Sequence, residues 1–119
     1  MPDVNALVAH ADDAFDAVRA MNHGTIWESQ YVAPPTPYRL LGNLSTAGGH
    51  GLAQLLGQLA DRLDESAARD DLYDAEGGDP GLAAATAVAL LRDSAERARA
   101  VGVLLDRAQS AVASVGVRD

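Results

Sequence analysis

Apolar residues recur at helical spacing along most of the chain. Between Val4 and Asn22 they follow one another at alternating steps of four and three, the period of a helix with one buried stripe. This stripe consists of Val4, Val8, Ala11, Phe15 and Val18. Asp3 precedes it as an N-cap and Gly24 follows it near a C-terminal stop, so we expect a first helix over residues 4–22.

A second helical pattern follows a proline-rich segment. Three prolines near its end favour extended geometry, so we expect residues 25–36 to form a connecting arm. Thr36 and Pro37 then provide an N-cap and a first helical residue, and a helix is expected over residues 37–70. Its expected stripe consists of Leu41, Leu44, Gly48, Leu52, Leu55, Leu56, Leu59 and Leu63.

Glycines interrupt this second pattern near its middle. Gly48, Gly49 and Gly51 each cost about 1 kcal/mol relative to alanine in a helix interior. Two interpretations stay open. Either another element packs closely against the glycines, or the helix breaks near Gly48–Gly49 and the protein has four helices instead of three.

A third helix is expected over residues 80–115, after an acidic, glycine-rich loop at residues 71–79. Asp79 and Pro80 supply its N-cap and first turn. Its stripe holds a four-three rhythm that only Gln109 interrupts, and it consists of Ala84, Val88, Leu91, Ala95, Ala98, Gly102, Leu105 and Val112. On its outer face the sequence predicts two i,i+4 ion pairs, Arg92 with Glu96 and Asp93 with Arg97.

These elements predict a single all-α domain spanning residues 1–119, a bundle of three or four helices built on a long antiparallel hairpin. The hairpin needs a further covering element, because the third helix is apolar on more than one side around Val103 and Leu104. At 1.5 Å per residue the first helix reaches only about 28 Å along a hairpin of about 50 Å. The proline arm, a second helix that folds back at its glycines, or a second copy of the chain could close the gap. We favour a homodimer.

Composition limits the classes of molecule that this protein is expected to bind. The 17 acidic residues outnumber nine basic ones, all of them arginine, for a net charge of −8. Because the arginines are scattered among carboxylates, direct contact with nucleic acid is not expected. The uncharged run from Leu40 to Ala60 contains too many polar residues and glycines for a membrane span. The N-terminal segment lacks the cations and the apolar core of a signal peptide, so cytoplasmic residence is expected.

The sequence carries no motif that is diagnostic of catalysis. Nucleophile elbow, phosphate-binding loop, dinucleotide fingerprint and zincin patterns are missing from it, as are cysteine and lysine. The three histidines have no metal-ligand spacing, and the acidic segment 61–79 does not fit a calcium-binding loop. We therefore expect neither an enzyme nor a bound cofactor or metal.

Six residues are candidates for contact with a protein partner. Three aromatics are assigned to the proline arm, where rings either anchor a partner or plug the open end of the bundle. His50 has glycine on both sides, which exposes the backbone around it. Two further residues belong to the apolar patch of the third helix. The six are Trp27, Tyr31, Tyr38, His50, Val103 and Leu104.

The segments YRLLGNLSTAGGHGLAQLLGQLADRL and GGDPGLAAATAVALLRDSAERA resemble small uncharacterised helical proteins of high-GC Gram-positive bacteria, some of them encoded near mobile elements. This likeness covers most of the chain after Thr36 and implies no known activity. The chain does not match the WXG100 hairpin family, because Trp27 is followed by Glu28 and Ser29 and precedes both long helices.

We therefore expect a non-catalytic helical module for protein–protein interaction, with a foreign protein or a second copy as its partner. Two other hypotheses are compatible with the sequence. One is a secreted substrate or adaptor of a specialised export system. The other is an accessory protein of a mobile element that acts through a protein partner.

Overall fold

The computed structural model describes residues 3–26, 36–69, 71–116 and 118. Within these ranges the chain forms helices joined by loops and contains no strand, so the predicted all-α fold is confirmed. The chain divides into two compact units, Met1–Ala33 and Pro34–Asp119. In the described residues, the first unit holds one helix and the second holds a long helical hairpin.

Helix α1, Val4–Thr25, begins where the sequence predicts and ends three residues later. An Asp3 carboxylate oxygen accepts hydrogen bonds from the backbone N–H groups of Asn5 and Ala6 at 3.0 and 3.2 Å, which caps the helix. Within its own unit the expected stripe is not buried. No residue of α1 is buried, and side chains such as Phe15 are more than half exposed, since the described residues of this unit hold no second helix.

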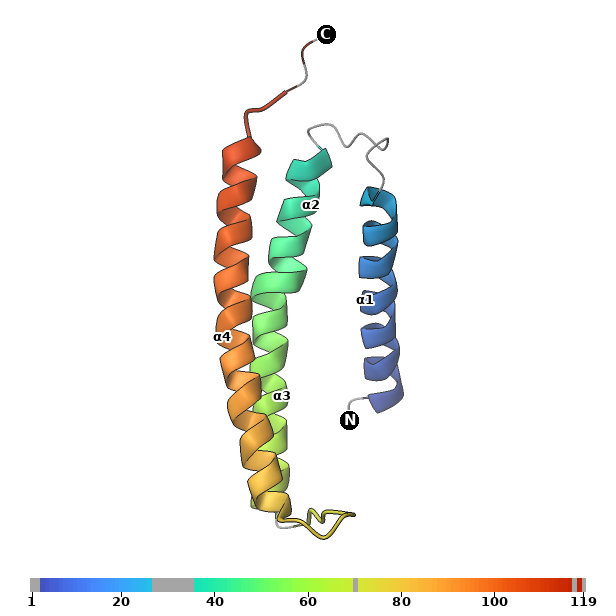
Figure 1. Ribbon diagram of the computed structural model, residues 1–119, viewed down its shortest axis with the longest axis vertical. Coiled ribbons are helices and arrows are strands. Elements are labelled where there is room, and N and C mark those ends of the chain that lie inside the picture. The colour runs from blue at the N-terminus through green and yellow to red at the C-terminus, as the bar shows by residue number, and fades with distance from the viewer. Residues whose placement is uncertain (1–2, 27–35, 70, 117, 119) are drawn as a thin grey trace. The chain divides into compact units, whose positions relative to one another are not determined.

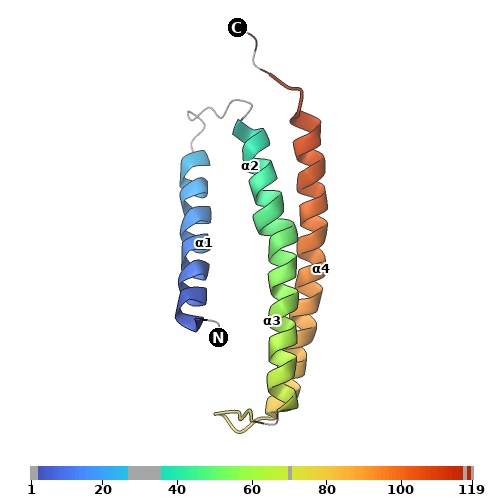
Figure 2. The same cartoon turned by 180° about the vertical axis from the view of Figure 1, so that it is seen from behind.

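The second unit is an antiparallel hairpin. Its first arm consists of helix α2 (Thr36–Leu44), the π-helical turn η1 (Ser45–His50) and helix α3 (Gly51–Ala68), which follow one another directly. Its second arm is helix α4 (Pro80–Val112), which runs beside the whole first arm (Figure 1, and from behind in Figure 2). Both long helices of the sequence prediction are therefore present, each ending two or three residues early.

The glycine cluster lies in a π-helical turn and not at a break. At the end of η1 the Gly51 N–H donates to the Thr46 carbonyl, five residues back along the chain, instead of to the α-helical partner four residues back. The four-helix alternative is thereby excluded for the hairpin. Close packing, the other alternative, is confirmed, because Gly49 is buried against Gly102 of α4.

Small residues form the seam between the two arms. The buried residues of the described hairpin are all alanine, glycine or serine: Ser45, Gly49, Ala53, Ala60, Ala84, Ala95, Ala98 and Gly102. A Cβ atom added to Gly49 would lie under 3.0 Å from the backbone N and Cα of Gly102, closer than real Cβ atoms come. The two backbones therefore touch at this pair of glycines.

The stripe predicted on α4 is confirmed. Its four-three positions from Ala84 to Val112 are all buried or half-buried, and this includes Gln109, whose side-chain amide donates to the Tyr38 carbonyl at 3.1 Å. Gly42 makes room for that amide, since a Cβ on Gly42 would meet it closely. Gln109, the polar residue in the stripe, thus forms a hydrogen bond with the first arm.

The stripe predicted on the first arm is confirmed in part. Leu41, Leu44, Leu56 and Leu63 are half-buried as predicted, but between Ser45 and Ala60 several inward-facing positions lie one residue after the predicted ones. Its inward-facing positions are Ser45, Gly49, Ala53, Leu56, Ala60 and Leu63. The predicted Leu52, Leu55 and Leu59 are instead 37% to 48% exposed. The leucines dominate any count of hydrophobicity, but the short distance between the backbones selects small side chains for the seam.

The loop between the arms reverses the chain with the residues expected for it. Gly77 has a φ of 83°, a conformation that side chains with a Cβ rarely adopt. An Asp79 carboxylate oxygen accepts from the N–H groups of Gly81 and Leu82 at 2.9 and 3.2 Å, and Pro80 opens α4. The predicted cap at this end of the hairpin is confirmed.

Gly49→Ala should destabilise the hairpin. The new methyl group would collide with the backbone of Gly102, which cannot move aside as a flexible side chain can. Overpacking of this kind costs about 1–3 kcal/mol. Urea unfolding followed by circular dichroism should show a loss of that size in the free energy of unfolding.

Gly48→Ala is the matched control, since nothing lies within 4 Å of a Cβ added there. The same change one residue away should be neutral or stabilising by up to about 1 kcal/mol, because alanine favours helix over glycine. Equal effects of the two substitutions would contradict the close contact of Gly49 with Gly102.

Candidate interaction surface

A polar cluster crosses the hairpin beside the glycine contact. The Ser45 hydroxyl shares its one hydrogen between two acceptors, the Gly102 carbonyl at 3.1 Å and one carboxylate oxygen of Asp106. His50 Nε2 donates to the other oxygen, Oδ2, at 2.9 Å. Ser45 is 2% exposed, whereas the side chains of His50 and Asp106 are about half exposed. One carboxylate of α4 therefore holds both the first and the last residue of η1.

These contacts keep the Asp106 carboxyl ionised. Its pKa lies below the ordinary value, mainly because the Ser45 hydroxyl donates to it and next because His50 does. Partial desolvation acts in the opposite direction, and attraction to a protonated His50 adds a smaller lowering. The cluster thus favours a charged carboxylate at the junction of the two arms.

Serine, histidine and aspartate meet here without the arrangement of a nucleophilic triad. In such a triad the histidine lies between the serine hydroxyl and the carboxylate and removes the hydroxyl proton. Here the Asp106 carboxylate lies between Ser45 and His50. The Ser45 hydroxyl is also enclosed by the seam, away from any substrate. The geometry joins two helices and does not activate a nucleophile.

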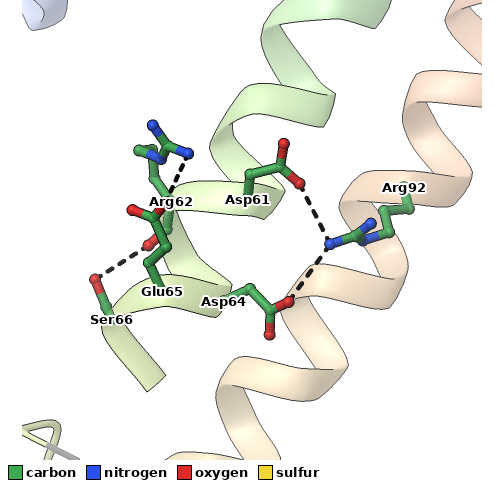
Figure 3. A network of polar contacts seen from close by, with 6 residues as sticks. All are labelled: Asp61, Arg62, Asp64, Glu65, Ser66 and Arg92. Carbon is green, nitrogen blue, oxygen red and sulfur yellow. Dashed lines mark hydrogen bonds and ion pairs between the residues drawn. The ribbon is translucent and has the colours of Figure 1, made fainter. Parts of the chain in front are cut away.

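A second polar contact joins the arms closer to the loop (Figure 3). The Arg92 guanidinium of α4 reaches Asp61 at 3.4 Å and Asp64 at 3.6 Å, both on α3. The predicted pairing of Arg92 with Glu96 is therefore wrong, because the guanidinium turns toward the first arm. The predicted pair within α4 is confirmed, with Arg97 Nε 3.1 Å from an Asp93 oxygen.

The polar contacts between the arms mark one side of the hairpin, which we call the polar side. Each acidic or basic residue in these contacts directly follows an inward-facing residue on its own helix. These members are His50, Asp61, Asp64, Arg92 and Asp106, which follow Gly49, Ala60, Leu63, Leu91 and Leu105. On both arms, the residue directly after each of these inward-facing residues therefore points to the same side of the hairpin.

Large apolar side chains occupy the positions that directly precede the seam. They are Leu52, Leu55 and Leu59 on α3, and Leu90, Val101 and Leu104 on α4, and they are 37% to 63% exposed. Successive helical residues lie about 100° apart, so these side chains point away from the polar side. Because the arms are antiparallel, the two sets meet on the opposite side of the hairpin, which we call the apolar side.

The structure describes four of the six predicted partner-binding residues. Trp27 and Tyr31 lie outside the described residues. Tyr38 belongs to helix α2 and not to the connecting arm, and its side chain is partly exposed. His50 is held by Asp106 on the polar side. The described members of this set therefore lie at different places on the hairpin.

Val103 and Leu104 are neighbours in α4 that belong to opposite sides. Val103 follows Gly102 and points to the polar side, whereas Leu104 precedes Leu105 and points to the apolar side. Both are exposed, by 45% and 60%. Of the four predicted residues that the structure describes, Leu104 is the one that lies on the apolar side.

Sequence reasoning missed the polar cluster. No sequence pattern marks Ser45 or Asp106, because a serine near glycines and an aspartate in a charged helix are both common. The available signal was that Asp106 directly follows a stripe position, as Arg92 does. Pairing it with His50 needed the register of the two arms, which only the structure supplies.

The described residues contain no group of three or more histidine, aspartate or glutamate side chains that could hold a metal ion. In the same ranges, no helix is long and apolar enough to cross a membrane. In comparisons with known proteins, no family model, no curated protein and no solved structure matches the chain. The case for a function therefore rests on the surface itself.

Acid should weaken the hairpin through Asp106. The pKa of this carboxyl is lower in the folded protein than its unfolded value of about 3.9. Its contribution to the free energy of unfolding is therefore complete above that value and is lost as the pH falls through the folded pKa. Urea unfolding at stepped pH should show a decline below about pH 4 that is shallower in Asp106→Asn.

Asp93→Asn serves as the comparison, because it removes an exposed carboxylate of α4 whose ion pair stays within one helix. This variant should keep the decline of the unsubstituted protein. If Asp106→Asn declined as steeply as Asp93→Asn, the link between the cluster and acid sensitivity would be wrong.

Proposed function

We propose that this chain is a non-catalytic helical module for protein–protein interaction and that it binds through the apolar side of its hairpin. The carrying observation is the segregation of its exposed side chains. Five exposed leucines and Val101 gather on one side of the seam, and the polar contacts between the arms gather on the other, beside Val103. A hairpin that had only to stay folded would gain nothing from concentrating exposed leucines on one side.

The size of the apolar side supports this proposal. Ordinary monomers expose single apolar residues, and contiguous patches of several hundred Å² mark binding surfaces. Six large aliphatic side chains lie on the apolar side, and aliphatic groups offer neither acid, base nor nucleophile for catalysis. Their chemistry suits contact with another apolar surface.

Two arginines share the apolar side with the aliphatic residues. Arg62 and Arg97 also precede inward-facing residues, and Arg97 lies between Leu90 and Val101 along α4. Arginine is enriched among interface residues, although charge as a whole is depleted at interface centres. Each of the two lies against an acid of its own helix, Arg62 with Glu65 at 2.9 Å and Arg97 with Asp93 at 3.1 Å. The charge on the apolar side is thus locally balanced.

Site-specific photo-crosslinking in living cells tests this function. A benzophenone amino acid at Leu104 should yield adducts heavier than the chain, because that position faces the apolar side. The same group at Val103 should yield few, although the two positions are adjacent and both exposed. Equal yields at the two positions, or none at either, would overturn the proposal.

A further inference from the structure

We infer that the partner on the apolar side is a second copy of this chain, so that two hairpins pack apolar side to apolar side as a four-helix bundle. The inference rests on the proposed function and names its partner. Three properties of the surface carry it: its area, its charge and the arrangement of its residues about a centre.

The area fits what a dimer needs. The exposed parts of the six large side chains amount to roughly 500 Å² of apolar surface, at the upper end of what a monomer leaves in one patch. A standard interface buries about 800 Å² on each partner, and about 65% of a homodimer interface is apolar. The apolar side thus supplies about the apolar area that one half of such an interface requires.

Charge permits self-association despite the net charge of −8. The carboxylates that join the arms, Asp61, Asp64 and Asp106, lie on the polar side and would face away from a second copy. The two arginines on the apolar side, Arg62 and Arg97, are each paired with an acid of their own helix. Two copies can therefore meet without opposing unpaired charges of like sign.

The residues are also arranged in a way that suits a twofold axis. Leu55 lies near the middle of the six apolar residues. Leu52, Val101 and Leu104 lie to one side of it, near the glycine contact, and Leu59 and Leu90 lie to the other side, toward the interhelical loop. An isologous interface repeats one patch on both partners, so leucines on either side of a centre can meet leucines of the second copy. Pairs of antiparallel helices packed in this way form a four-helix bundle.

Sedimentation equilibrium of the full chain at micromolar concentrations tests the inference. We expect a species of twice the 12.3 kDa chain mass. Leu104→Glu should place a charge in the interface and weaken the dimer at least 100-fold. Only the monomer, with the mass of one chain, should then be detected. Val103→Glu introduces the same charge one residue away on the polar side and should leave the dimer intact. Helical circular dichroism and cooperative urea unfolding confirm that each variant folds.

Other outcomes overturn the inference, and they separate it from the proposed function. A chain that stays monomeric at 100 µM, while the crosslinker at Leu104 captures a different protein, removes the second copy and keeps the interaction module. A monomer with no adducts from Leu104 removes both. A dimer that Val103→Glu disrupts and Leu104→Glu does not would place the interface on the polar side and overturn the assignment of the apolar side.

Discussion

At Gly49 and Gly102 the two arms of the hairpin meet backbone to backbone, at a separation that leaves no room for a side chain larger than hydrogen. This closeness decides what the rest of the seam can contain. Alanine and serine fit along it, and leucine is left half-buried or pushed outward. The exposed leucines of α3 therefore follow from the tight seam, because the positions nearest the partner helix are taken by small residues.

The polar contacts give this seam a fixed register. Small side chains alone specify alignment weakly, since one alanine resembles the next. Two polar contacts align the arms at different positions along the helices. At one, Asp106 binds Ser45 and His50, and at the other, Arg92 lies near two aspartates. Exposed ion pairs add little to stability, so we assign these groups a role in alignment. The result is a hairpin with two unlike sides.

Much of the fold could be predicted from the sequence. Caps at Asp3 and Asp79, and the four-three rhythm of α4, placed the helices to within a few residues. The seam of the first arm could not be predicted in the same way, because exposed leucines masked a buried row of small residues. The two sides of the hairpin were also beyond sequence reasoning, since they depend on which residues of one arm stand opposite those of the other.

The π-helical turn has a consequence for how the chain can vary in length. Three successive seam residues of the first arm face α4 at steps of four and four: Ser45, Gly49 and Ala53. Two turns of a regular stripe take seven residues, so this stretch contains one residue more than usual. The wider turn absorbs that residue. A sequence one residue shorter between Ser45 and Gly49 would form an uninterrupted α-helix with the same seam. This stretch of η1 is thus a place where the hairpin accommodates a deletion without exchanging its two sides.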